Sequence, residues 1–207
     1  WARRCVYETG TMSLNKPIKF GFVRGPVWNF GDEDMKHGIE EFVKNAQLDI
    51  EELDLGKDFD DAAKTHEIIM NGYIANYLMN YYQTDKSNLH PFTVKRIEAG
   101  IPVSASDYVS AIEQAKKMEQ ILKQFFLKYD AIITPAAPGQ APRDLMNTGN
   151  AIFNGYWTMM GVPAISLPFL KGKDDLPIGI QFIANWSEDL KLLEICKYIL
   201  KKEKLAN

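Results

Sequence analysis

The sequence Asp130-Ala-Ile-Ile-Thr-Pro-Ala-Ala-Pro138 contains the first of three short apolar runs from which the fold of this chain can be argued. All three have the length and composition of strands and are bounded by Pro or Gly; they cover residues 131–134, 164–167 and 178–183. Each is too short for a helix and too apolar for a strand with one face in solvent. We therefore expect three neighbouring strands in a buried sheet.

Upstream of these runs, the chain shows a strand–helix–strand pattern. Ile18–Val23 is a β-branched and aromatic run that ends in Arg-Gly-Pro. Acidic residues at 32–34 open a helix through Gln47, and residues 48–55 alternate Leu or Ile with Asp or Glu. The pattern predicts two parallel strands joined by a right-handed crossover.

Between these two parts, helical patterns dominate. We expect a long helix from Asp58 to Tyr82, a shorter one after His90-Pro91, and a third over 108–128 that Ser104 or Ser106 caps. In the first helix the apolar positions are Ile68, Ile69, Tyr73, Leu78 and Met79. The sequence thus predicts an α/β layered protein. We expect one domain over 17–207 with a helical insertion at about 57–128, and a linker or the remnant of a removed N-terminal half over 1–16.

Composition excludes several classes of function. A net charge of −3 from interspersed signs favours no direct nucleic-acid contact, and no apolar run approaches the roughly 20 residues of a membrane span. The two cysteines form no disulfide framework, and no secretory signal is visible, so we expect a cytoplasmic protein. The three histidines lack metal-ligand spacing, so we expect neither metal nor cofactor.

From Asp130 onward the sequence resembles the C-terminal part of the amidase signature family, whose members cleave or transfer carboxamide groups. The resemblance rests on pieces in a fixed order, which are 130–138 with Ala141-Pro142, Asn147-Thr148-Gly149, Phe153-Asn154, Trp157-Thr158, 161–168, 176–181 and 188–193. It extends upstream through 16–23 and 96–108. It implies the C-terminal half of the amidase signature fold, a mixed β-sheet flanked by helices.

Members of that family use a Ser nucleophile, a second Ser that follows a cis peptide bond, and a Lys general base, in and around a Gly/Ser-rich stretch. This sequence contains no such stretch. Ser104-Ala-Ser106 is better explained as a helix cap, and Ser166 falls inside a predicted buried strand. We therefore expect no catalytic residue in this chain. The Ser-Ser-Lys groups would lie in a missing N-terminal half, and the chain alone would be inactive.

The candidate residues are therefore those of substrate-pocket walls. Residues 150–160 predict a short helix with Asn154 and Trp157 one turn apart, and the resemblance implies that both contact substrate. The alternative is that Trp157 is core and Asn154 caps a turn. Thr134 ends a strand where ligand crevices of α/β sheets lie. Arg96 matches a region in which amidotransferases hold a substrate carboxylate, although it can equally be a solvated charge.

The leading hypothesis is the C-terminal part of an amide-hydrolysing enzyme whose partner, in the full-length parent, is a small-molecule amide. Residues 153–158 (Phe-Asn-x-x-Trp-Thr) resemble the general amidase branch more than the tRNA-dependent one. The alternatives are a protein similar to the A subunit of glutamyl-tRNA amidotransferase, which acts in ammonia transfer on tRNA, and a non-catalytic binding or scaffold protein. Removal of the other half would uncover sheet edge at 131–134 and 164–183, which favours self-association.

Overall fold

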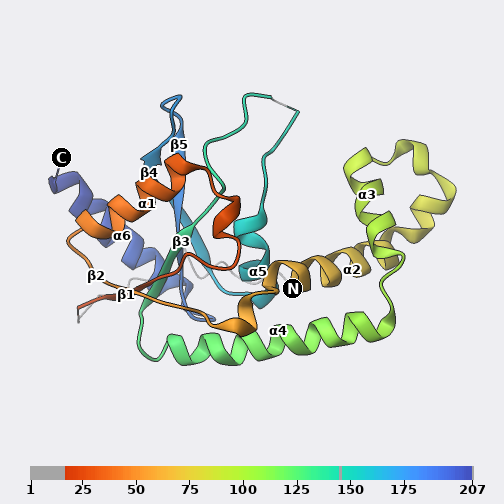
Figure 1. Ribbon diagram of the computed structural model, residues 1–207, viewed down its shortest axis with the longest axis horizontal. Helices are drawn as coiled ribbons and strands as arrows, with labels where there is room; N and C mark the ends of the chain where they lie inside the picture. Colours follow the sequence, from red (N-terminus) through yellow and green to blue (C-terminus); the bar gives the residue numbers. More distant parts are fainter. Residues whose placement is uncertain (1–16, 145, 207) are drawn as a thin grey trace.

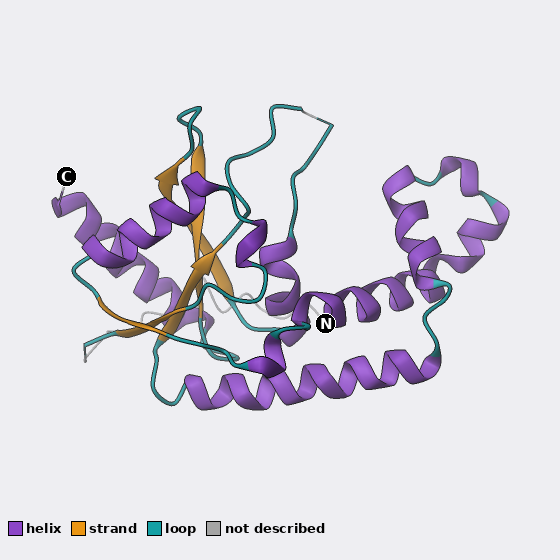
Figure 2. Cartoon of the chain, in the orientation of Figure 1, coloured by secondary structure: helices purple, strands orange, loops and turns teal. Residues whose placement is uncertain are grey.

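The computed structural model describes residues 17–144 and 146–206, and its centre is a five-stranded mixed sheet (Figures 1 and 2). The strand order is β2-β1-β3-β5-β4. The strands are β1 (Lys19–Phe22), β2 (Asp49–Glu52), β3 (Ala131–Pro135), β4 (Ala164–Lys171) and β5 (Pro177–Ile183). The segment 1–16, for which a linker is expected, lies outside the described residues.

The N-terminal pattern gives the predicted crossover unit. The helix α1 (Glu33–Asn45) connects β1 to β2, and the two strands are parallel, with Phe20 opposite Ile50. β1 also runs parallel to β3 on its other side. β2 is shorter than the predicted run 48–55, because the chain turns after it: the Asp54 side chain accepts a hydrogen bond from the Gly56 N–H at 2.8 Å.

The three apolar runs are neighbours in the sheet, as expected, with β5 antiparallel to both β3 and β4. Residues 131–134 are fully buried because β3 lies between β1 and β5. The expectation of an exposed sheet edge there is therefore wrong. Ser166, expected inside a buried strand, is exposed. β4 is an edge strand with alternating burial, so every second side chain leaves the core.

Three helices form an arm that extends away from the sheet (Figure 1). They are α2 (Ala62–Thr84), α3 (Pro91–Gly100) and α4 (Ala105–Phe125). α2 buries small residues such as Ala62 and Ala75, and a Cβ at Gly100 would overlap the backbone of α2 at Asn71. Tyr73, one of the apolar positions of the expected helix, is 59% exposed. The arm projects past the sheet, and α2 packs against α3, α4 and α5.

The starts of α3 and α4 follow the sequence signals, whereas the helix expected from Asp58 begins at Ala62, after a 3-10 turn over Lys57–Phe59. Ser104 caps α4: its Oγ accepts a hydrogen bond from the Asp107 N–H at 3.0 Å and donates one to the Asp107 carboxylate at 2.6 Å. His90 caps α3 by accepting the Phe92 N–H at Nδ1, 3.2 Å away. The expected capping role of Ser104 is confirmed.

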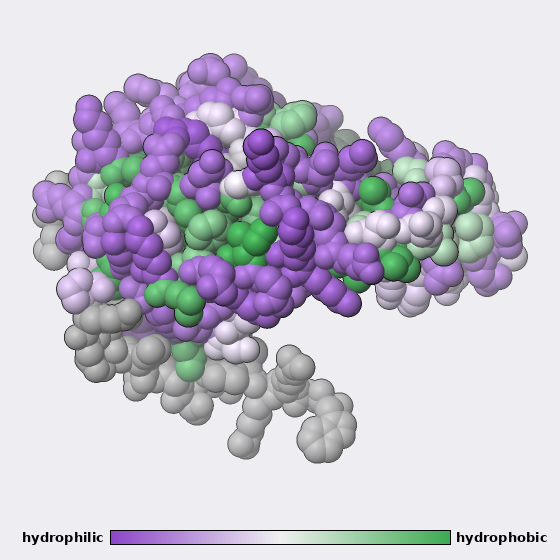
Figure 3. Space-filling view, turned by 60° about the horizontal axis from the view of Figure 1, so that its bottom comes forward, coloured by the Kyte–Doolittle hydropathy of each residue, from purple (hydrophilic) through white to green (hydrophobic). Residues whose placement is uncertain are grey.

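Two further helices complete the fold, α5 (Ile152–Met160) and α6 (Asp189–Ala206). α6 packs on β4 and β5, and α5 lies between the sheet and the arm (Figure 1). The largest buried side chains come from the sheet, from α5 and from the short 3-10 helix Lys57–Phe59: Trp157, Tyr156, Phe20, Phe59, Phe153 and Phe182. The face shown in Figure 3 is largely hydrophilic, with hydrophobic patches at its centre and on the arm, where Ile101 and Val109 are exposed.

Candidate functional site

A cavity of about 980 Å³ opens where the segment between β3 and α5 meets α5 and the β4–β5 hairpin. Its walls come from the loop (Ala136–Pro142 and Asn147–Ala151), from α5 (Asn154 and Thr158), from the hairpin (Ala164, Ser166, Pro177, Gly179 and Gln181) and from Asp32 at the start of α1. Small residues and uncharged hydrogen-bonding side chains therefore make up nearly the whole described lining.

The loop that forms the outer wall holds its shape through its own Asp and Asn side chains. Asp144 accepts the Met146 N–H at 2.9 Å, Asn147 accepts the Gly149 N–H at 2.9 Å, and Asn150 accepts the Ile152 N–H at 3.0 Å. In each case the side chain bonds the backbone two residues on, which is the Asx-turn pattern. The Asn-rich sequence thus gives a shaped wall in which most side chains are uncharged.

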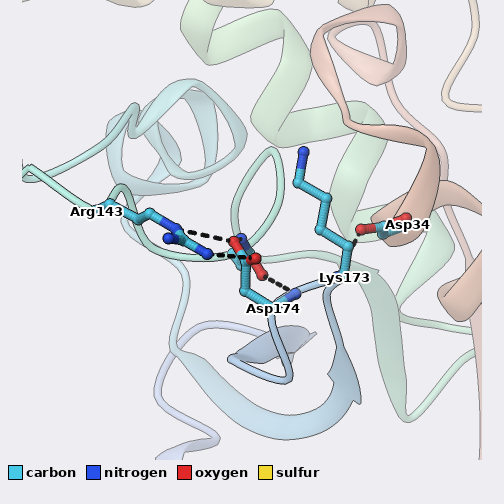
Figure 4. Close-up of polar contacts among 5 residues, drawn as sticks. Asp34, Arg143, Lys173 and Asp174 are labelled. Carbon is cyan, nitrogen blue, oxygen red and sulfur yellow. Dashed lines mark hydrogen bonds and ion pairs between the residues drawn. The ribbon is translucent and has the colours of Figure 1, made fainter.

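A set of charged and polar contacts ties this loop to the rim of the cavity (Figure 4). The Arg143 guanidinium donates two hydrogen bonds to the Asp174 carboxylate, at 2.6 and 3.3 Å, and Gln140 also donates to Asp174. Asp34 at the start of α1 accepts the backbone N–H of Lys173 at 2.8 Å. Arg143, and then Gln140, hold the pKa of Asp174 below its usual value. The loop, the hairpin turn and α1 are thereby joined at one rim.

The floor of the cavity is one face of the β4–β5 hairpin. Ser166 on β4 and Gln181 on β5 are register partners, and Gln181 is also opposite Thr134 on β3. A Cβ at Gly179 would overlap the Ser166 hydroxyl, so a glycine there keeps the floor open. The floor therefore presents one hydroxyl and one carboxamide side by side.

The structure separates the four residues proposed from the sequence as substrate contacts. Asn154 is half-buried and lines the cavity. Thr134 is fully buried and Trp157 is 1% exposed; neither is among the described lining residues. Asn154 and Trp157 are both on α5, but Asn154 lines the cavity and Trp157 is in the hydrophobic core.

Four buried polar atoms of β3, α5 and β5 have no hydrogen-bond partner among the described residues: Thr134 Oγ1, Tyr156 Oη, Trp157 Nε1 and Gln181 Nε2. Burial raises the pKa of Tyr156 well above its ordinary value, while the neighbouring Thr134 and Trp157 side chains act in the opposite direction. Of the four residues, only Gln181 lines the cavity.

Arg96 lies on α3, at the end of the arm away from the sheet (Figure 1), and is not among the described lining residues. Its guanidinium donates to the Asn71 side chain at 3.2 Å and stacks over the Phe92 ring at 5.1 Å. Arg96 therefore ties α3 to α2.

Within residues 17–144 and 146–206, no group of three or more His, Cys, Asp or Glu side chains is placed to hold a metal ion. His66, in the groove between α2 and α4, is half-buried; burial, and then the charge of Arg96, lower its pKa. Burial raises the pKa of Cys196 to about 12, so this thiol is not activated. In the same part of the chain no helix is long and apolar enough to cross a membrane.

Sequence reasoning missed Ser166, Gln181 and Asp32 as lining residues. Ser166 and Gln181 were assigned to buried strands, and Asp32 was interpreted only as a helix-opening acid. The available signal was the small residue at every second position of β4, Ala164 and then Ser166, which is typical of a strand with one open face.

Comparisons with known proteins identify the family. The family model described as Amidase matches residues 6–193 of this chain. The protein belongs to the Amidase family. This Amidase-family chain is 34% identical over 125 residues to the A subunit of glutamyl-tRNA(Gln) amidotransferase from Aliarcobacter butzleri, and the match covers 55% of this chain and 28% of that protein. It is 29% identical over 97 residues to putative amidase AmiC of Mycobacterium leprae, covering 41% and 21%.

Solved structures show the same α/β fold. An amidase crystal structure superimposes with a TM-score of 0.76 at 17% identity, over 87% of this Amidase-family chain and 45% of the other. A 6-aminohexanoate cyclic dimer hydrolase with bound substrate gives a TM-score of 0.67 at 17% identity, over 87% and 44%. The chain thus spans less than half of each of these relatives.

Proposed function

We propose that this Amidase-family protein takes part in amide hydrolysis by supplying one wall of the pocket that holds a small carboxamide substrate. The observation that carries the proposal is the cavity between the loop, α5 and the hairpin, with its uncharged hydrogen-bonding lining. A carboxamide has both donors and acceptors, and the side chains of Asn154 and Ser166 in the lining offer both. The cavity also begins where β3 ends, the place where α/β sheets bind ligands.

The chemical step needs a nucleophile with a base beside it. Ser166 is the only serine in the described lining, and that lining contains neither Lys nor His to activate it. Ser104 is engaged in the cap of α4. We therefore propose that the Ser-Ser-Lys groups typical of the family come from polypeptide outside the described residues, and that this chain alone does not turn over amides.

In this proposal Asn154 is the direct substrate contact among the four sequence candidates. Thr134 and Trp157 act from below, because they support β3 and α5 without reaching the described lining. Arg96 has no role at this cavity; its contacts keep α3 on α2.

A second candidate is ammonia transfer in a glutamyl-tRNA amidotransferase. It is favoured by the sequence similarity to the A subunits of such enzymes, for example 33% identity over 132 residues in Acinetobacter baumannii. In that case the same wall would face the carboxamide that donates the ammonia, and the chain would function together with other polypeptides in one complex.

Binding of butyramide, a small uncharged carboxamide, tests the proposal. In amide-resolved NMR titrations of this chain, we expect shifts among residues of the loop, α5 and the hairpin. Asn154→Ala should weaken binding, and Asn76→Ala, a matched change at an exposed position on the arm, should not. Shifts confined to the arm, or none at butyramide concentrations near its solubility, would overturn the proposal.

A further inference from the structure

The described lining of the cavity contains a single ionisable side chain, that of Asp32. Ala, Gly and Pro residues and uncharged polar side chains make up the rest, with no Lys, Arg or His among them. A cavity with this composition offers nothing to neutralise a substrate carboxylate, and it adds a negative charge of its own.

Asp32 is held in place by its backbone rather than by its side chain. Its N–H donates to the Pro138 carbonyl at 2.7 Å. A Cβ at Gly139 would overlap the Asp32 carboxylate, so a glycine in the loop leaves room for that carboxylate at the rim. The acid at this position therefore sits against the wall of the cavity.

The Asp32 carboxylate is uncommitted within the described part of the chain. Asp32 occupies the N-cap position of α1, yet its side chain makes no cap hydrogen bond, and no described cation pairs with it. The two acidic residues that follow it have partners: Glu33 pairs with Lys36 at 3.0 Å, and the Asp34 carboxylate accepts the Lys173 N–H.

Two of the basic side chains near the rim are paired with carboxylates. Arg143 is paired with Asp174 at 2.6 Å, and Lys171 is paired with Asp175 at 2.7 Å (Figure 4 shows the first pair). Lys173 contributes its backbone N–H to Asp34, and its side chain is not among the described lining.

A second polar group is available inside the cavity. Gln181 lines the floor, is only 6% exposed, and its Nε2 has no partner among the described residues. A buried carboxamide without a full set of partners favours a ligand that supplies a hydrogen-bonding group.

From these observations we infer that Asp32 sets substrate specificity: the pocket takes amides that carry an amino group, or no charge, and rejects amides that carry a carboxylate. The inference rests on the proposed function and deepens it.

Three amides of nearly equal size test the inference, because they share a propanamide skeleton and differ in charge at neutral pH. They are butyramide (neutral), β-alaninamide (positive) and succinamate (negative). Unit charges about 4 Å apart change affinity about five-fold even in bulk water, and by more in a partly desolvated site. We therefore expect β-alaninamide to bind at least about five-fold more tightly, and succinamate at least about five-fold more weakly, than butyramide.

Variants of this chain complete the test. Asp32→Asn should bring the three affinities together, and Asp32→Lys should reverse their order. Glu33→Gln, one residue away and exposed, is the matched control and should leave the order unchanged. The differences should also shrink as salt is added.

The outcomes distinguish the two claims. If butyramide binds in the cavity but all three amides bind alike, or Asp32→Asn changes nothing, the inference on specificity is wrong and the proposed function stands. If butyramide does not bind there, the proposed function is wrong, and the inference that rests on it falls with it.

Discussion

Replacement of Trp157 by Ala should destabilise the protein strongly, because the account makes Trp157 a core residue. Its side chain is 1% exposed and packs against Tyr156, with ring centroids 4.8 Å apart. A buried Trp removes about 150–250 Å² from water, which at about 25 cal/mol/Å² corresponds to about 4–6 kcal/mol. Measured Trp→Ala losses in cores are about 3–5 kcal/mol. We expect a loss in the free energy of unfolding of about 4 kcal/mol.

Trp157→Phe keeps an aromatic ring at this position and removes the indole N–H. The indole Nε1 has no acceptor among the described residues, so the replacement forfeits no hydrogen bond there and costs only the lost volume, about 1–2 kcal/mol. Trp186→Phe is the matched comparison, because the Trp186 Nε1 donates to the Met160 carbonyl at 2.7 Å and that bond would be lost.

Urea unfolding followed by circular dichroism measures these losses. With a slope of about 2–3 kcal/mol per molar urea, Trp157→Ala should lower the midpoint by about 1.3–2 M. Asn154→Ala should move the midpoint by less than about 0.5 M and weaken butyramide binding. The reasoning is refuted if Trp157→Ala leaves the midpoint within about 0.5 M of the parent value while butyramide binding disappears, since Trp157 would then be a substrate contact.

Four further changes test other parts of the structure. Ser104→Ala removes the cap of α4 and should lower the free energy of unfolding in urea by about 1 kcal/mol. Ser106→Ala, inside the exposed first turn, should lower it by less than about 0.5 kcal/mol. Equal losses would contradict the capping assignment. Gly100→Ala forces α3 away from α2 and should cost about 1–3 kcal/mol, measurable as a lower Tm, and an unchanged Tm would show that the helices are not in close contact. Lys128, and then Lys19 and Tyr129, lower the pKa of Glu51 from 4.5 to about 2. The stabilisation by ionised Glu51 is therefore complete above about pH 4.5 and is lost as the pH falls towards 2. The difference in the free energy of unfolding between the parent and Glu51→Gln should close over that range, and a difference independent of pH would contradict this assignment. The open edge of β4 should make the chain self-associate with rising concentration in sedimentation, and a monomer at every concentration would contradict this expectation.

The central strands could be predicted because their signals are local. The runs at 131–134, 164–167 and 178–183 are apolar, short and bounded by Pro or Gly, and all three became neighbouring strands. The cap at Ser104 and the start at His90-Pro91 are equally local, because the bonds that form them lie within three residues. Local chemistry was sufficient there.

The errors concern which faces of the elements are covered, and no local signal contains that information. Tyr73 has helical spacing with other apolar residues, but α2 extends past the sheet and leaves it exposed. Ser166 lies between two apolar residues, but β4 has a neighbour on one side only, and its outer face forms the cavity floor. Asp32 is a plausible helix-opening acid in any sequence; only the approach of Gly139, over a hundred positions later, brings it to a cavity.

The candidate site shows the same limit within one helix. Asn154 and Trp157 are one turn apart, and the spacing alone could not say which of them meets the cavity. The packing of α5 between the sheet and the arm decides it: Trp157 is in the core and Asn154 lines the cavity.

The central claim is that this chain provides a pocket wall and that the catalytic groups lie outside the described residues. The most direct test is amide turnover by the purified 207-residue chain, with butyramide and β-alaninamide as substrates and ammonia release as the readout. The account predicts no release above the rate without protein, for the parent chain and for Ser166→Ala alike. Sustained ammonia release by the parent chain, whether or not Ser166→Ala removes it, would contradict the account.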